Sequence, residues 1–136
     1  ARRFNLLPGL LPASLYQRGL QLKSHLRSQV LEACERYDVL LTPYQPTPPP
    51  RIDDTKKPLL SKEQALTELR DFSFSTAAPV SGVPAVSIPC GFTHDGLPIG
   101  LQIMAKRFDE ESVFRAAYAY EQDTQWHSMR PPVGDQ

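Results

Sequence analysis

The sequence lacks a long apolar run, an excess of charge of either sign and a framework of paired cysteines. No uninterrupted apolar stretch approaches the roughly 20 residues that a membrane helix needs. Basic and acidic residues are equal at 15 each, so the net charge is zero and nothing predicts binding to nucleic acid or to a membrane. Two cysteines, Cys34 and Cys90, do not make a disulfide framework, which favours a reducing compartment. We therefore expect a cytoplasmic protein.

The short motifs of the common catalytic classes are also missing. There is no G-x-S-x-G, no S-x-x-K and no glycine-rich phosphate loop. The three histidines have no i, i+4 partner and no neighbouring C-x-x-C, so we expect no metal or other cofactor. Asp53 and Asp54 are adjacent in a loop, where neighbouring carboxylates point apart. Cys90 has only His94 as a nearby base, and we interpret it as a small apolar filler at a strand end.

The beginning of the chain predicts a piece of a longer protein. Ala1 stands where an initiator methionine is absent. Pro8 and Pro12 interrupt the apolar part of the first residues, which argues against a signal peptide. We expect residues 1–136 to form a single α/β segment of a larger domain.

Helical spacing is clearest at the two ends of the chain. Pro12 suits the first turn of a helix that we expect to reach Arg36, with an apolar stripe of Leu15, Leu22, Leu26, Val30, Cys34 and Tyr37. Asp109 is a good N-cap for a second helix ending near Asp123, with Trp126 packing back on the fold. That second helix would bury Val113, Phe114, Ala117, Tyr118 and Tyr120. A capping-box pattern predicts a further helix over residues 62–72.

Strand signals lie between the helices. Residues 39–41 are apolar throughout and predict a strand buried on both faces. Residues 44–58 are rich in proline and predict an extended or irregular loop. Asp95 and Gly96 form a hairpin signal between two apolar segments, so residues 84–92 and 98–105 should pair antiparallel. Residues 73–82 predict a loop or a frayed helix end. The order of the elements indicates an α/β fold.

Two longer stretches carry the most specific pattern, YDVLLTP from Tyr37 and SGVPAVSIPCGFTHDGLPIGLQIMAKRFDEESVFRAAYAYEQDTQWHSMRPP from Ser81. Together they resemble the C-terminal part of the amidase signature family, over most of the chain from about Pro8 to Val133. The resemblance implies the C-terminal part of a mixed-sheet α/β fold, with an antiparallel hairpin and flanking helices. It also implies amide hydrolysis by a Ser–cis-Ser–Lys set in a Gly/Ser-rich signature upstream. This sequence contains no such signature, so the resemblance implies a non-catalytic part that hydrolyses nothing by itself.

The resemblance also indicates where the parent protein would hold its substrate, a small-molecule amide. Tyr44 and Gln45 follow the LTP segment, and Asp71, Phe74 and Ser75 precede SGVP. We predict these five residues as the substrate-binding set. The hairpin itself is then scaffold that backs the pocket.

Three functions remain open at this point. Glutamine-using members, such as the A subunit of the tRNA-dependent amidotransferase, place an acidic residue where an ungapped match puts Phe72, and a common family asparagine is Pro79 here. These departures favour a general amidase over that amidotransferase component. A stand-alone scaffold or interaction domain is the third alternative. Self-association and partner subunits both remain compatible with the sequence.

Overall fold

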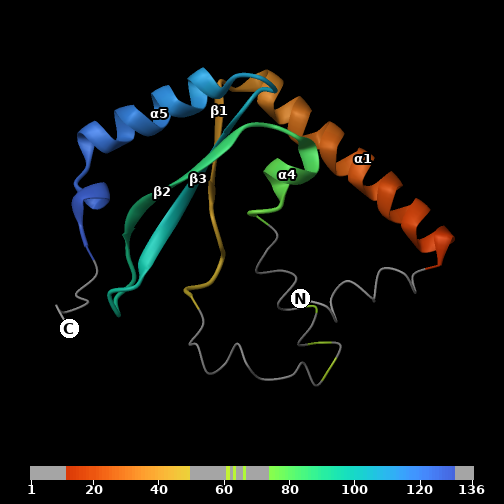
Figure 1. Cartoon of the computed structure of the whole chain (residues 1–136), viewed down its shortest axis with the longest axis horizontal. Coiled ribbons are helices and arrows are strands. Elements are labelled where there is room, and N and C mark those ends of the chain that lie inside the picture. The colour runs from red at the N-terminus through yellow and green to blue at the C-terminus, as the bar shows by residue number, and fades with distance from the viewer. Residues whose placement is uncertain (1–11, 50–60, 62, 64–65, 67–73, 131–136) are drawn as a thin grey trace.

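The computed structural model describes residues 12–49, 61, 63, 66 and 74–130, which form helices around a three-stranded sheet (Figure 1). Their order is α1 (Ala13–Arg36), β1 (Val39–Pro43), α4 (Ala77–Ser81), β2 (Ala85–Phe92), β3 (Pro98–Ala105), α5 (Glu110–Asp123) and the 3-10 helix η2 (Trp126–Ser128). This mixture of helices and sheet confirms the predicted α/β class. No helix within the described ranges is both long enough and apolar enough to cross a membrane.

The two long helices begin where the sequence predicts. Pro12 precedes α1, and its carbonyl accepts hydrogen bonds from the N–H groups of Leu15 and Tyr16 at 2.9 and 3.2 Å. The side chain of Asp109 accepts from the N–H of Ser112 at 3.2 Å and so caps α5. Such a cap satisfies one of the N–H groups that the first helical turn leaves unpaired.

The sheet has the order β1-β3-β2, and both pairings are antiparallel. Ile103 of β3 lies opposite Leu41 of β1 and Val86 of β2, which defines the register of both strand pairs. The predicted hairpin is therefore confirmed. A bulge lies between Pro89 and Gly91, so Cys90 is the extra residue that has no partner in β3.

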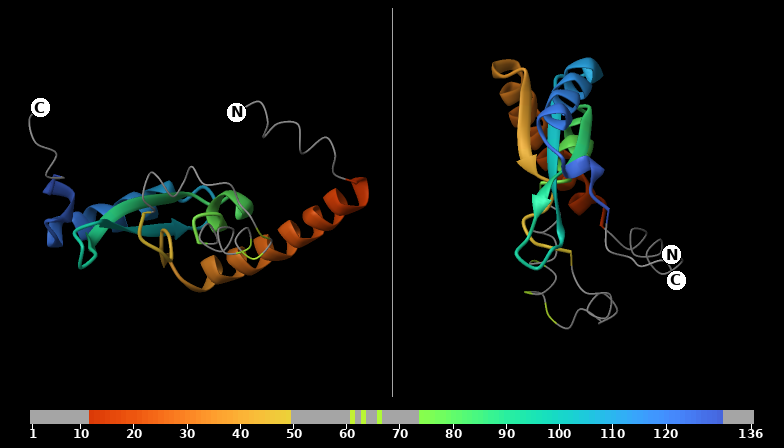
Figure 2. Two further views of the ribbon diagram at one scale, coloured as in Figure 1. Left: turned by 90° about the horizontal axis from the view of Figure 1, so that it is seen from below. Right: turned by 90° about the vertical axis from the view of Figure 1, so that its left-hand side faces the viewer.

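Alternate residues of β3 face two separate cores. Ile103 packs with Ile88 and with Ala117 of α5. Met104 points to the opposite face and packs with Cys34 of α1 and Ala78 of α4. Because strand side chains alternate between faces, the sheet separates α5 from the α1–α4 pair. Figure 2 shows this layering, with α1 running away from the sheet toward its N-terminal end.

Three expectations about burial are wrong. In β1 Leu41 is 59% exposed, because within the described residues this strand pairs with β3 alone. In α1 only Val30 and Cys34 of the predicted stripe pack in the core, and Leu15, Leu22, Leu26 and Tyr37 are exposed. In α5 Phe114 and Tyr118 are also exposed, because the helix packs on the sheet through the face that carries Ala117.

Residues between β1 and β2 are described only in part. Of the expected helix over residues 62–72, Glu63 and Leu66 are helical, and most of the rest lies outside the described residues. Further along, the predicted loop or frayed end contains the short helix α4, which ends at Gly82 with a left-handed φ of 71°. Ser81 is fully buried there, and its Oγ donates to the carbonyl of Ala77 at 2.6 Å.

Candidate functional site: a hollow beside the end of β1

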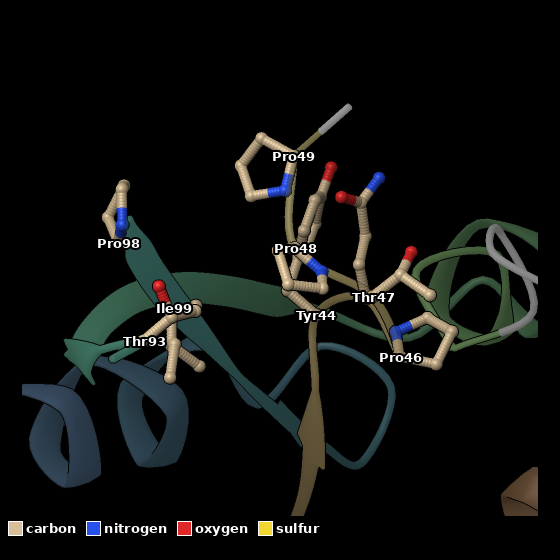
Figure 3. Close-up of a pocket in the computed structure, with 10 residues that line it drawn as sticks. Tyr44, Pro46, Thr47, Pro48, Pro49, Thr93, Pro98 and Ile99 are labelled. Carbon is tan, nitrogen blue, oxygen red and sulfur yellow. The ribbon is translucent and has the colours of Figure 1, made fainter. Parts of the chain in front are cut away.

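A hollow of about 360 Å³ lies where the chain leaves β1 and passes the hairpin (Figure 3). Its lining comes from two segments, the start of the proline-rich loop and the turn end of the hairpin: Tyr44, Gln45, Pro46, Thr47, Pro48, Pro49, Thr93, Pro98, Ile99 and Gly100. The two segments are far apart in the sequence. The antiparallel pairing of β1 with β3 brings them together.

Gly100 holds Tyr44 at the edge of this hollow. The backbone N–H of Tyr44 donates to the carbonyl of Gly100 at 2.9 Å, which continues the β1–β3 ladder by one residue. A Cβ on Gly100 would lie 3.1 Å from the Cβ of Tyr44 and 3.1 Å from Oγ of Ser87. The absence of a side chain at Gly100 therefore lets the Tyr44 backbone and ring lie close to the sheet. Tyr44 remains 41% exposed, so its ring borders both the hollow and solvent.

The structure brings together two of the five residues predicted to bind substrate. Tyr44 and Gln45 both line the hollow. Phe74 and Ser75 directly precede α4 and are not part of this lining; the carbonyl of Phe74 accepts from the N–H of Ala77 at 3.2 Å. Asp71 lies outside the described residues. The set of five remains a prediction.

Sequence reasoning missed the lining from the hairpin, namely Thr93, Pro98, Ile99 and Gly100. The hairpin itself was predicted, but which of its strands pairs with β1 was not. The sequence marks the end of β1 by its apolar run, which stops at Pro43, but it does not show that Pro43 pairs with Leu101. That register places Gly100 and the hairpin residues before it beside Tyr44.

The lining favours a neutral ligand that accepts and donates hydrogen bonds. Its polar side chains are the phenol of Tyr44, the amide of Gln45 and the hydroxyls of Thr47 and Thr93, and its apolar surface is largely proline. The lining contains no Asp, Glu, His, Lys, Arg or Cys side chain. Among the residues that the structure describes, no group of three or more His, Cys, Asp or Glu side chains is placed to hold a metal. The hollow can bind and orient a small polar molecule, but it holds no nucleophile with a base.

The two thiols lie outside this lining and are not activated. Burial raises the pKa of the Cys90 thiol, and His94 lies at the hairpin turn with its Nδ1 3.5 Å from an Asp95 carboxylate oxygen. Cys34 is 1% exposed, and its Sγ lies 3.7 Å from the carbonyl oxygen of Ala105. Burial, followed by the charge of Glu35, raises the pKa of Cys34. Nucleophilic cysteines need the opposite shift.

Comparison with known proteins gives the same family throughout. The family model described as Amidase matches residues 2–114. The A subunit of glutamyl-tRNA(Gln) amidotransferase from Thermodesulfovibrio yellowstonii is 38% identical over 120 residues, which are 85% of this chain and 23% of that protein. Its counterpart from Methanosarcina barkeri is 41% identical over 117 residues, 86% of this chain and 23% of that protein. The chain thus spans about a quarter of the length of these relatives.

Solved structures agree with this match. The corresponding amidotransferase protein from Thermotoga maritima superposes with a TM-score of 0.72 at 29% identity, covering 96% of this chain and 28% of that one. A 6-aminohexanoate cyclic dimer hydrolase complexed with substrate superposes with a TM-score of 0.76 at 25% identity, covering 91% of this chain and 27% of that one. The helices and sheet of this chain are therefore those of a part of these enzymes. The matches in sequence and in structure together show that the chain belongs to the amidase family.

Proposed function

We propose that this chain is the C-terminal, pocket-forming part of an enzyme that hydrolyses carbon–nitrogen bonds of amides. The observation that carries the proposal is the hollow beside Tyr44 and Gln45, because it offers neutral hydrogen-bonding groups to a neutral substrate. A carboxamide has one carbonyl acceptor and N–H donors, which the phenol and the side-chain amide complement. The family match supports the chemistry.

In this proposal the chain supplies binding and other parts of the protein supply the reaction. The Ser–cis-Ser–Lys set of the family would lie upstream, where a neutral lysine takes a proton through the bridging serine from the nucleophile. Tyr44 and Gln45 would orient the amide toward that serine. Orientation of this kind lowers the barrier by fixing the reacting atoms in place before reaction.

A second candidate is the A subunit of a glutamine-dependent tRNA amidotransferase, which would act with partner subunits. The names of the curated relatives and their 38% and 41% identity favour it. Phe72 and Pro79, which depart from the pattern of glutamine-using members, favour a general amidase. The two candidates differ in substrate, since the second requires glutamine.

The test is a chimera in which this chain replaces the segment that it matches in the Thermotoga maritima protein. We expect the purified chimera to release ammonia from an amide, and the isolated 136-residue chain to release none. Glutamine and a series of simple carboxamides would be compared. Turnover of glutamine alone would support the second candidate. A folded chimera that hydrolyses none of them would contradict both.

Two substitutions examine the role of the hollow. Removing one hydrogen bond to substrate costs about 0.5–1.5 kcal/mol, so Tyr44→Phe and Gln45→Ala should each raise KM about 2- to 10-fold. Tyr118→Phe is the matched control, because Tyr118 is an exposed tyrosine on α5, away from the lining. Equal kinetics for Tyr44→Phe, Gln45→Ala and the control would show that the hollow does not contact substrate.

A further inference from the structure

We propose that a second hollow, at the C-terminal end of α5, binds a small organic cation of the alkylammonium class. This α5 hollow has a volume of about 350 Å³ and is lined by Asp123, Thr124, Gln125, Trp126 and Met129. It shares no lining residue with the hollow beside β1. The inference goes beyond the proposed function and does not depend on it.

Asp123 gives the α5 hollow its charge. It is the last residue of α5 and carries the only acidic or basic side chain of the lining. His127 and Arg130 follow in the sequence but do not belong to the lining. Among the residues that the structure describes, no ion-pair or hydrogen-bond partner lies against the Asp123 carboxylate. The carboxylate is therefore available to a ligand of opposite charge.

The end of the helix adds to this negative potential. The carbonyl end of an α-helix carries a partial negative charge of roughly half an elementary charge. In α5, which is 14 residues long, no basic residue in the last turn offsets that charge. The C-cap residue, Thr124, donates its hydroxyl proton to the carbonyl of Tyr120 at 2.9 Å, so its oxygen can only accept from a ligand. Charge and acceptors together favour a cation over an anion.

Trp126 supplies an aromatic wall. It lies in the 3-10 helix η2, which follows α5 (Figure 1). Its ring forms an edge-to-face pair with Phe92, with the centroids 6.0 Å apart and the planes at 61°. Because Phe92 ends β2, this pair holds the indole against the sheet. The face of an indole attracts cations, and more strongly than the rings of tyrosine and phenylalanine do.

The apolar part of the lining suits the carbon groups of an alkylammonium ion. Met129 is 50% exposed and adds a polarisable thioether beside the indole. A bare metal ion would gain little from these two side chains, since hard cations prefer several oxygen ligands. A volume of about 350 Å³ is at the small end of the range for ligand sites, so it fits one small molecule.

The experiment titrates the intact 136-residue chain with choline and follows the emission of Trp126, the only tryptophan. The neutral control is the alcohol in which a carbon atom replaces the choline nitrogen, because it has the same shape without the charge. Sodium chloride at equal concentration controls for ionic strength. We expect a saturable change with choline and an affinity about 5- to 30-fold higher than that of the alcohol.

Two matched substitutions test the role of the carboxylate. Asp123→Asn should weaken the binding of choline about 2- to 5-fold and leave the binding of the alcohol unchanged. Glu110→Gln is the control, because it removes one carboxylate at the opposite end of the same helix. Circular dichroism confirms that each variant is folded. A merely structural role of Asp123 would change the affinities for both ligands equally.

A second measurement does not need the tryptophan. Binding broadens the choline methyl signal in proton NMR, so Trp126→Leu can be compared with the original chain, and its affinity for choline should fall about 2- to 30-fold. The same NMR titration on the chimera covers the case in which the isolated chain does not fold. Equal affinities for choline and the alcohol, no saturable choline signal, or equal effects of Asp123→Asn and Glu110→Gln would each overturn the proposal. None of these outcomes depends on amide hydrolysis.

Discussion

Replacing Gly100 by alanine should destabilise the chain by crowding Tyr44. The new Cβ would lie 3.1 Å from the Cβ of Tyr44 and 3.1 Å from Oγ of Ser87, closer than ordinary van der Waals contact. The Ser87 hydroxyl can rotate away. Tyr44 cannot move freely, because its N–H is held 2.9 Å from the Gly100 carbonyl oxygen. Forcing one extra methyl group into a packed site costs about 1–3 kcal/mol.

The assay is urea or thermal unfolding of the intact chain, followed by circular dichroism. For a chain of this length, 1 kcal/mol changes the melting temperature by about 3–6 °C. Gly19→Ala is the matched control, since a Cβ on Gly19 meets nothing within 4 Å in the interior of α1. That control should be more stable than the original chain by about 0.5–1 kcal/mol, because alanine favours helix.

The two glycine variants should therefore change stability in opposite directions. If Gly100→Ala unfolds at the same urea concentration as the original chain, the close approach of Tyr44 to the sheet is refuted. If both variants lose stability equally, the effect comes from glycine replacement in general. Either result would also remove the physical basis for the position of Tyr44 at the hollow.

Further perturbations address other parts of the fold. In urea titrations, Asp109→Ala should lower the free energy of unfolding by about 1 kcal/mol, because the α5 cap is lost. Asp109→Asn should retain most of the stability that the cap contributes, because asparagine can also cap a helix. Burial raises the pKa of both thiols. Their contribution to the free energy of unfolding should therefore be complete below pH ~8.5 and should be lost as the pH rises through the raised pKa values. Iodoacetamide followed by mass spectrometry should modify Cys90 before Cys34, which is 1% exposed; rapid alkylation of Cys34 at neutral pH would contradict its burial. Phe92→Ala should shift the emission of Trp126 to longer wavelength, since the two rings lie 6.0 Å apart in a T-shaped pair and Trp126 is the only tryptophan. Unchanged emission would argue against that pair.

Local signals in the sequence predicted the elements well because their causes are local. Pro12 and Asp109 mark helix starts through backbone groups within a few residues, and the structure confirms both starts. Asp95 and Gly96 predict the hairpin for the same reason, and Gly96 adopts a φ of 77° in the turn. The family resemblance rests on longer runs of such residues, and the comparisons confirm it.

Burial was predicted less well, because it depends on neighbours that a periodic pattern does not name. Leu22 and Cys34 belong to one predicted stripe, yet one is 64% exposed and the other 1%. Only the C-terminal part of α1 meets α4 and β3, so the same periodicity leads to two outcomes. Leu41 was expected to be buried for its apolar character and is exposed because, within the described residues, β1 is an edge strand.

By itself the sequence determined the class of fold, the boundaries of the two long helices and of the hairpin, and the family, because each follows from short-range backbone chemistry or from an ordered run of residues. Only the tertiary structure decided that β1 joins β3, and this pairing places Tyr44 against Gly100 and creates the hollow. It also decided which leucines of α1 stay exposed. The physical reason is that strand pairing and packing join residues far apart in the chain, such as Tyr44 and Gly100, and such contacts leave no periodic trace in the sequence.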